Sequence, residues 1–414
     1  MKINTDPKKV EEDKSSSPPF ATARVIDEAL TRRVEQVLPG KESLKKLMRK
    51  RRIRLYLGID PTGTKLHLGH TITLRKLQDF ADLGHEAILL IGTGTVLAGD
   101  PSLREAARKM INEREVQENI KTWKKQAGKI LNFKKVKIRY NGEWLLKLDL
   151  QGIIKIASKI SAAKLFQREM FQNRIKKGGT VWTHEFLYPL LQGYDSVALK
   201  TDLEIGGTDQ VFNMLIGREL VDKMLGKEKF VLTCPMILGT DGKPMSKSSG
   251  NCVWIEDSPD QMFGKIMSIP DSLILPYLEL LTDLPSRAIR QYKKAFQLKK
   301  VNPRDLKEKL ALEIVKKFHS LKIAQRAREE FKRVFKEKKI PSQISKIKIQ
   351  KKEIPLLELL VKTKLVSSKS GAKRLVLQKG VKIDGKIQND WKEIIRIKKG
   401  LILQVGKRRF AKIK

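Results

Sequence analysis

Two histidines, His67 and His70, lie three positions apart in the stretch "YLGIDPTGTKLHLGHTITLRKLQDF", residues 56–80, of a chain that has only five histidines. A short apolar run precedes them and a pattern with helical spacing follows them, which places the pair at the start of a helix. Positions i and i+3 of a helix face the same side. A glycine-bearing loop that enters a helix also offers free backbone N–H groups and the positive end of the helix dipole. The pair is therefore expected to bind phosphate and to stabilise developing charge, not to act as a nucleophile.

Two other interpretations of the histidine pair stay open at this point. The pair could bind a metal ion, although no third Cys or His and no paired carboxylate lies nearby, and the HExxH spacing is absent. It could also be a structural feature of a helix start. The nearby segment "GTGTVLAGD", residues 92–100, superficially suggests a P-loop. It lacks the Gly-Lys-Ser/Thr ending that such a loop needs, so that interpretation fails.

A second candidate segment is "GTDGKPMSKSSGN", residues 239–251, which follows an apolar run. A loop of Gly, Ser and Lys at a strand end is flexible, and Lys247 in it could close over a triphosphate as a mobile charge. Such a loop by itself is more often only solvated. Lys247 could act on a phosphate together with the histidine pair only if the fold brings this loop beside them.

The order of apolar runs indicates the elements that must position these segments. Residues 54–60 form a short apolar run, residues 70–83 have helical period, Gly84 fits the position after a helix, and residues 86–92 form a second buried run. Strand, helix, strand in this order is a βαβ unit, which implies a parallel sheet. The apolar run "KFVLTCPMIL", residues 229–238, suits the same sheet.

The last segment of the chain reads as a separate module with its own short elements. Two short helices are expected, with Ser367 or Ser368 capping the second and Gly380 closing it, and a hairpin is expected at Asp384-Gly385. From Ser342 onward there are 21 basic and five acidic residues, a surplus of 16. The whole chain has 86 Lys plus Arg against 46 Asp plus Glu, a formal net charge of +40. Such a surplus favours a polyanionic partner, either nucleic acid or an anionic membrane surface, although part of it is ordinary solvated surface.

The remaining composition narrows the class of protein. Two cysteines, Cys234 and Cys252, exclude a disulfide framework and a Cys-rich zinc site. The first twenty residues are charged and rich in Ser and Pro, lack the apolar core of a secretory signal, and are expected to form a disordered tail. The longest apolar runs are too short to span a bilayer. A cytoplasmic protein with no membrane partner is expected.

The two candidate segments together resemble the signatures of class I aminoacyl-tRNA synthetases: "HLGH" resembles the HIGH motif and "PMSKS", residues 244–248, resembles KMSKS. Four further stretches resemble the bacterial tyrosyl-tRNA synthetases, namely "LYLGIDPT" at 55–62, "AGDPS" at 98–102, "YPLLQGYD" at 188–195 and "GGTDQ" at 206–210. The C-terminal segment resembles the small RNA-binding module that these enzymes share with a ribosomal protein. The resemblance covers about residues 25–414 with order and spacing kept.

This resemblance implies an activity and its partners. ATP and L-tyrosine would give tyrosyl-adenylate and pyrophosphate, and the tyrosyl group would then pass to the 3′ end of tRNA(Tyr). ATP with Mg²⁺ would be a substrate, with no tightly bound cofactor and no protein metal site. The family is a homodimer joined through an inserted segment, and its tRNA bridges the subunits.

The implied fold class is α/β, with a Rossmann-like parallel-sheet catalytic domain that carries a helical insertion, followed by an all-helical domain and a small α+β RNA-binding module. The expected boundaries are a disordered tail at 1–20, the catalytic domain at 21–257 with its dimerisation insertion at about 104–180, an anticodon-arm-binding domain at 258–337, a linker at 338–352 and the basic module at 353–414.

The resemblance also assigns roles to single residues. Tyr56 and Asp195 would hydrogen-bond the substrate phenol, and Asp100, Tyr188 and Gln192 would hold its ammonium group. Tyr188, Gln192 and Asp195 have the spacing of one helix face, which independently favours a single pocket. Catalytic roles would belong to His67, His70, Lys247, Thr62 and Gln210, and ATP contacts to Gly58, Asp60, Gly69, Gly207, Asp209, Lys243 and Ser246. Arg104 and Arg108 stand where the family has basic residues that contact pyrophosphate or tRNA.

The sequence departs from the family pattern at three places. Pro244 replaces the first lysine of KMSKS, with Lys243 one residue earlier, Thr208 stands where Ser is common, and Val211-Phe212 replace a more usual Trp-Gly. Three rivals therefore stay open: a tryptophan-activating relative, a small nucleotidyltransferase with an HxGH loop, and a non-catalytic paralogue that binds RNA. The Tyr56/Asp195 pair suits a phenol better than an indole N–H donor, the nucleotidyltransferases are generally shorter, and the intact histidine pair argues against a non-catalytic protein.

Overall fold

The computed structural model describes residues 23–102, 113–245, 249–335, 345–406 and 409–414. Four residues to which the sequence assigns a role, Lys247, Ser246, Arg104 and Arg108, lie outside these ranges. The chain forms two compact units, one of Met1–Ser258 with Lys265–Phe318 and the other of Pro259–Gly264 with His319–Lys414. Each unit is described by itself.

The first unit is built on a six-stranded sheet with the strand order β1-β6-β5-β2-β3-β4. The strands are β1 (Gln36–Leu38), β2 (Arg54–Ile59), β3 (Glu86–Ile91), β4 (Val136–Tyr140), β5 (Leu203–Gly207) and β6 (Phe230–Cys234). The predicted βαβ unit is confirmed, since β2 pairs with β3 in parallel and Tyr56 lies opposite Ile88. Only the edge strand β1 departs from the parallel arrangement, because it pairs antiparallel with β6.

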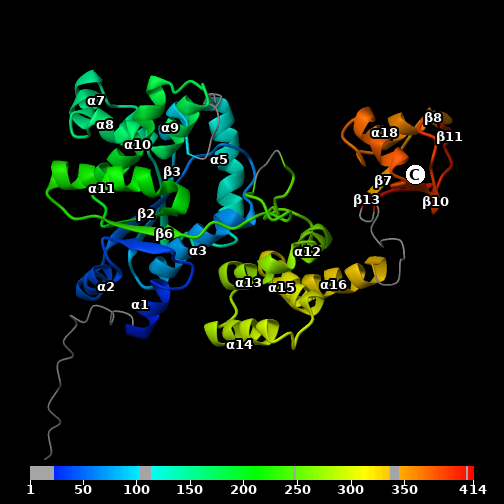
Figure 1. Cartoon of the computed structure of the whole chain (residues 1–414), viewed down its shortest axis with the longest axis horizontal. Coiled ribbons are helices and arrows are strands. Elements are labelled where there is room, and N and C mark those ends of the chain that lie inside the picture. Colours follow the sequence, from blue (N-terminus) through cyan, green and yellow to red (C-terminus); the bar gives the residue numbers. More distant parts are fainter. Residues whose placement is uncertain (1–22, 103–112, 246–248, 336–344, 407–408) are drawn as a thin grey trace, which may run out of the picture. The chain divides into compact units, whose positions relative to one another are not determined.

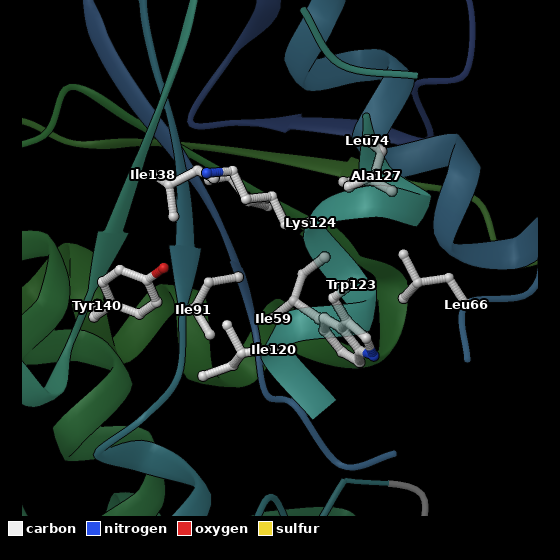
Figure 2. A pocket seen from close by; sticks show the side chains of 11 residues that line it. Ile59, Leu66, Leu74, Ile91, Ile120, Trp123, Lys124, Ala127, Ile138 and Tyr140 are labelled. Atoms are coloured by element: carbon white, nitrogen blue, oxygen red, sulfur yellow. The ribbon is translucent and has the colours of Figure 1, made fainter. Parts of the chain in front are cut away.

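Helices cover both faces of this sheet (Figure 1). Leu89 and Ile91 of β3 line a cavity together with α3 (Leu68–Asp82) and α5 (Glu113–Ala127), whereas Ile88 and Leu90 pack with Leu199 at the end of α10 (Thr183–Ala198). Because successive strand residues point to opposite faces, α3 and α5 lie on one face and α10 on the other. Figure 2 shows Ile120 and Trp123 of α5 facing Ile59 and Ile91 across that cavity. The helix α11 (Val211–Leu225) packs along α10 and against β5 and β6.

The remaining elements complete the first unit. They are α1 (Ala23–Ala29), α2 (Lys41–Lys50), α4 (Thr95–Ala98), α6 (Gly142–Leu145), α7 (Leu150–Ala157), α8 (Ala162–Phe166), α9 (Glu169–Lys176), the 3₁₀ turns η1 (Thr208–Gln210) and η2 (Asp271–Leu273), and α13 (Ile274–Leu281), α14 (Ser286–Gln297) and α15 (Pro303–Phe318). The helix α12 (Pro259–Met267) begins in the second unit and ends in the first. The predicted series of helices after residue 258 is thus present.

The second unit contains α16 (Leu321–Phe335) and the basic module. The module consists of β7 (Ser345–Ile347), β8 (Glu353–Pro355), α17 (Leu356–Lys362), α18 (Lys369–Leu377), β9 (Val381–Ile383), β10 (Lys386–Ile387), β11 (Ile394–Arg396), β12 (Ile402–Val405) and β13 (Arg409–Ile413). The strand β7 pairs in parallel with β13, so this part of the segment expected to be a linker belongs to the module's sheet.

Local turn chemistry explains how the module's chain reverses. Ser368 caps α18 by accepting the Gly371 N–H, one of the two caps the sequence suggests. At the other end, Lys379 adopts the left-handed conformation (φ 55°) and the Gly380 N–H bonds to Leu375 O, so Lys379, not Gly380, makes the turn that ends the helix. The predicted hairpin is confirmed, with positive φ at Asp384 and Gly385 between β9 and β10.

Among the residues that the structure describes, no helix is long and apolar enough to cross a membrane.

Candidate functional site

The predicted site residues gather at the carboxyl ends of the parallel strands, where open α/β sheets bind ligands. Asp60 follows β2, Gly207 is the last residue of β5, and Asp209 and Gln210 lie in the 3₁₀ turn that follows it. Tyr188, Gln192 and Asp195 all lie on α10, and Asp195 is inside this helix and buried, which excludes a helix-cap role for it. The Tyr188 hydroxyl donates to Asp60 Oδ2 at 2.9 Å and thereby joins α10 to the end of β2.

The histidine pair forms the N-terminal cap of α3. The His67 Nδ1 atom accepts the Gly69 N–H at 3.1 Å, and the His70 Nδ1 atom accepts the His67 N–H at 3.1 Å. The two rings lie 3.8 Å apart between centroids, which confirms that they face the same side. A Cβ at Gly69 would lie 2.9 Å from the His67 ring, so only glycine fits between them. A neutral imidazole whose Nδ1 accepts must carry its proton on Nε2, so the cap leaves both rings as Nε2–H donors.

The second signature segment lies against the first. Leu68 N donates to Val253 O and Ile255 N donates to Leu66 O, each at 2.9 Å, so the chain after the lysine loop is bonded to the chain that carries the histidines. A Cβ on Gly69 would lie 3.7 Å from the Met245 sulfur, at the near end of that loop. The loop base is tied by Asn251, whose Nδ2 donates to Asp241 Oδ1 at 2.8 Å and to Pro244 O at 3.0 Å. Lys243 is exposed in the same base, and its carbonyl accepts the Gly239 N–H at 2.7 Å.

One face of α5 holds the loop between Asp60 and the histidines. Asn119 donates to Pro61 O at 2.7 Å, Trp123 Nε1 to Gly63 O at 2.5 Å, and Gln126 Nε2 to Thr64 O at 2.7 Å. Gln126 Oε1 also accepts the Leu66 N–H at 2.7 Å. Thr62 lies within this held loop, and its N–H donates to Asp60 O at 2.8 Å. Because these contacts are to backbone atoms, the path of the loop depends on α5 and not on the loop's own side chains.

The two residues assigned to the substrate phenol are both buried, and each has protein partners. Asp195 accepts from Trp144 Nε1 at 2.8 Å and from Asn141 Nδ2 at 3.0 Å. The Tyr56 hydroxyl lies 2.9 Å from Ser196 Oγ. Burial raises the pKa of Asp195 and of Tyr56 well above their ordinary values, so Tyr56 stays neutral, whereas the hydrogen bonds from Asn141 and Trp144 oppose the shift of Asp195 and favour its carboxylate form.

A second network holds the acids at the end of β5. Asp100 Oδ1 accepts the Ser102 hydroxyl at 2.6 Å, and Asp100 Oδ2 accepts Gln210 Nε2 at 2.9 Å. Gln210 Nε2 also donates to Asp209 Oδ2 at 3.0 Å. Burial raises the pKa of Asp209. A Cβ at Gly207 would lie 2.4 Å from Asp209 Oδ1 and would displace that carboxylate, whereas at Gly58 it would make an ordinary contact with the Tyr56 ring at 3.6 Å.

The structure adds four candidate site residues that the sequence did not indicate. Thr95 donates to Asp60 Oδ1 at 2.7 Å, and Asn141 and Trp144 bond to Asp195. Arg168 is buried between the rings of Phe171 and Phe212 and donates to Ser102 Oγ at 2.6 Å. Burial lowers the pKa of Arg168, and the negative charge of Asp100 opposes this shift. Asn141 directly follows β4, whose alternation of apolar and charged residues is the signal that could have found it, since strand ends form the site. Arg168, in the insertion, has no such signal.

Among the described residues, no group of three or more His, Cys, Asp or Glu side chains is placed to hold a metal ion.

Family models and relatives match nearly the whole length of this chain. Residues 48–336 match the family model "tRNA synthetases class I (W and Y)", and residues 330–413 match "Tyrosine--tRNA ligase SYY-like C-terminal domain". The tyrosine–tRNA ligase of Thermotoga maritima is 45% identical over 385 residues, covering 93% of this chain and 96% of the relative. That of Carboxydothermus hydrogenoformans is 43% identical over 397 residues, covering 93% and 97%.

Solved structures agree on the fold. A C-terminally truncated mitochondrial tyrosyl-tRNA synthetase of Aspergillus nidulans has a TM-score of 0.63 at 21% identity and covers 76% of this chain and 98% of its own. The tyrosyl-tRNA synthetase of Archaeoglobus fulgidus complexed with L-tyrosine has a TM-score of 0.60 at 22% identity and covers 74% and 100%. Both support the α/β fold class that the sequence predicts.

The paired histidine cap, the loop bonded beside it, and relatives more than 40% identical over nine-tenths of the chain lead to one assignment. The chain belongs to the class I tRNA synthetases of the tryptophan and tyrosine group and, within that group, to the tyrosine–tRNA ligases.

Proposed function

We propose that this chain activates L-tyrosine with ATP and transfers the tyrosyl group to the 3′ end of tRNA(Tyr), using the residues gathered at the strand ends. The observation that carries the proposal is the pair of 2.9 Å backbone bonds that join residues 66–68 to residues 253–255. These bonds hold the histidine cap beside the base of the lysine loop. Phosphate donors from two distant segments can therefore act on one triphosphate.

In the first step the tyrosine carboxylate attacks the α-phosphorus of ATP in line, and pyrophosphate leaves. The Nε2–H groups of His67 and His70 donate to phosphate oxygens as charge shifts onto the leaving group, with Thr62 beside them. Lys247 approaches from the loop, and Lys243 serves as a second cation in place of the motif lysine lost at Pro244. Mg²⁺ enters with ATP as part of the substrate, because phosphate oxygens are its natural ligands.

The tyrosine pocket discriminates by hydrogen bonds. Tyr56 donates to the substrate phenol oxygen, and Ser196 can then donate to the Tyr56 oxygen. The phenol O–H donates to Asp195, which Asn141 and Trp144 hold in orientation. Phenylalanine is rejected because it has no hydroxyl to take the place of the hydrogen bonds that Tyr56 and Asp195 would make to the phenol. Asp100, Tyr188 and Gln192 take the ammonium group.

The nucleotide lies along the strand ends. Gly58 and Gly69 leave room for it, Asp60 and Gly207 line the adenylate, Asp209 accepts from the ribose, and Gln210 lies near the reacting carboxylate. The Gln210 bonds to Asp100 and Asp209 support this arrangement, because they tie the amino-acid side of the site to the ribose side.

We further propose that the enzyme is a cytoplasmic homodimer joined through the insertion. Four exposed apolar side chains on or beside α6 to α8 support this: Leu146, Leu150, Ile154 and Phe166 are 63%, 72%, 58% and 47% exposed. An apolar surface of this kind is typical of an interface. The helices after residue 258 would bind the anticodon arm, and the basic module would bind the tRNA backbone.

The experiment that tests this function is amino-acid-dependent exchange of pyrophosphate into ATP, with tyrosine, tryptophan and phenylalanine compared. Exchange with tyrosine alone is expected. Exchange with tryptophan would overturn the roles of Tyr56 and Asp195. If folded protein bound tRNA but catalysed no exchange, the change at Pro244 would have removed the catalytic activity, and the chain would be an RNA-binding protein.

A further inference from the structure

A buried ion pair lies behind the tyrosine pocket. Glu204 of β5 and Lys229, the residue before β6, are 1% and 0% exposed, and the Lys229 Nζ atom forms a close ion pair with Glu204 Oε2. Lys229 also donates to Met214 O at 3.2 Å. Burial lowers the pKa of Lys229, and the Glu204 carboxylate opposes that shift. Two charges removed from water in this way seldom add net stability, so their presence calls for another explanation.

The Glu204 carboxylate also accepts hydrogen bonds from two side chains of α10 beside the tyrosine pocket. Glu204 Oε1 accepts from Gln192 Nε2 at 3.0 Å. Glu204 Oε2 accepts from Ser196 Oγ at 3.4 Å, and Ser196 in turn lies 2.9 Å from the Tyr56 hydroxyl. The pair therefore contacts, directly or through one hydroxyl, a residue proposed for the ammonium group and a residue proposed for the phenol.

The bond to Glu204 sets the orientation of the Gln192 amide and therefore which of its two polar atoms can bind a ligand. An ionised carboxylate only accepts hydrogen bonds, so it must face the amide NH₂ group. The Gln192 Oε1 atom is then left over, and it is buried without a hydrogen bond among the residues that the structure describes. A buried acceptor without a partner is costly and suits a ligand that only donates. A substrate ammonium group is such a ligand.

We propose that the Glu204–Lys229 ion pair is a positioning device that fixes the Gln192 amide with its oxygen toward the substrate ammonium group. This inference rests on the proposed function, because it takes the ammonium role of Gln192 from there. Lys229 Nζ pairs with Glu204 Oε2 in a buried site, and a carboxylate that only accepts hydrogen bonds excludes the flipped amide. A neutral side chain at position 204 could accept or donate and would leave both amide orientations open.

The test uses the full-length double variant Glu204→Gln/Lys229→Met, which removes both charges together and leaves neither unpaired. Equilibrium binding is measured by calorimetry for two tyrosine fragments. Tyramine keeps the phenol and the ammonium group, and 3-(4-hydroxyphenyl)propionate keeps the phenol and the carboxylate but has no ammonium group. Any change at the phenol end affects both fragments, so the difference between them reports on the amide alone.

We expect tyramine to bind about tenfold more weakly to the double variant and the propionate to change less than about twofold. Glu204→Asp is a second test that keeps the charge but moves it away from Gln192, and it should weaken tyramine selectively as well. Asp202→Asn is the matched control, because Asp202 is also buried and ion-paired, with Arg51 and Lys227, but is bonded to neither Gln192 nor Ser196. It should weaken neither fragment.

Equal weakening of the two fragments, or no weakening of either, would overturn the inference, since the pair would then be only structural. Gln192→Ala separates this failure from that of the proposed function. If Gln192→Ala weakens tyramine selectively and the double variant does not, the positioning role alone is wrong. If Gln192→Ala has no selective effect, the ammonium role of Gln192 is wrong and the inference fails with it.

Discussion

The His70 Nδ1 atom accepts the backbone N–H of His67 at 3.1 Å, and this single bond serves both the helix and the chemistry. It satisfies a donor that the start of a helix would otherwise leave without a partner. It also places the proton of the neutral ring on Nε2, the donor that the proposed phosphate role requires. The signature histidine is thus a capping residue and a hydrogen-bond donor together.

These two roles can be separated at position 70. His70→Gln keeps a side chain that can complete the capping box, whereas His70→Ala does not. Both variants should lower the turnover of tyrosine-dependent pyrophosphate exchange about a hundredfold or more, because both lose the transition-state donor. Only His70→Ala should also lose about 1 kcal/mol of stability, seen in its unfolding midpoint. Near-normal turnover in His70→Gln would show that capping is the whole contribution of His70.

The contacts of α5 predict a remote effect on phosphate chemistry. Gln126→Ala removes the bonds to Thr64 O and Leu66 N and leaves that buried N–H unpaired, at a cost of about 1–3 kcal/mol. Turnover in pyrophosphate exchange should fall while the KM for tyrosine changes little, because the loop carries the histidines and not the phenol site. Lys125→Ala, at an exposed position of the same helix, is the control. A change confined to the KM for tyrosine would contradict the idea.

The exposed apolar residues of the insertion predict the oligomeric state. Phe166→Asp with Leu150→Asp should convert a dimer into a monomer, because burying two carboxylates at an apolar interface is strongly unfavourable. Sedimentation of the purified protein measures this directly. Leu377→Asp, at a position 61% exposed in the basic module, should leave the dimer intact. A wild-type chain that sediments as a monomer would remove the basis for the proposed interface.

His85 predicts a loss of stability in acid. Burial, with a further contribution from the Arg52 charge, lowers the pKa of His85 from 6.5 to about 4, and its Nδ1 accepts the Ile53 N–H at 3.4 Å. Between these two pKa values the unfolded chain binds the extra proton, so stability is fully present above pH 6.5 and falls as the pH drops toward 4. The lost stability amounts to about 3 kcal/mol at most.

His85→Asn offers a neutral acceptor for the same N–H and should remove this part of the pH dependence. Thermal unfolding midpoints of both proteins, measured from pH 7 to 4, test the prediction. Parallel curves for the two proteins would mean that His85 does not contribute.

The basic module predicts salt-dependent tRNA binding. Lys373 Nζ lies 4.2 Å from the centre of the Trp391 ring, so charge and an aromatic face are together on one surface. Lys373→Glu should raise the KM for tRNA in aminoacylation and reduce its dependence on salt, with pyrophosphate exchange unchanged. Lys134→Glu makes the same charge change at an exposed position in the catalytic unit and should have a smaller effect. Equal effects of both variants would favour a general electrostatic attraction over a specific surface.

The sequence by itself determined the parts of this protein that depend on neighbouring residues. Periodicity and turn chemistry, which act over a few residues, give the strand–helix–strand order around residues 54–92 and the place of His67 and His70 at a helix start. They also give the alignment of Tyr188, Gln192 and Asp195 on one helix and the hairpin at Asp384-Gly385. Only the tertiary structure decided which distant side chains complete the site. Asn141 and Trp144 reach Asp195 across more than fifty positions, α5 holds the loop before the histidines, and Lys229 pairs with Glu204. These partners come from separate strands and helices that the folded sheet and its covering helices bring together, and no local pattern records which side chains meet.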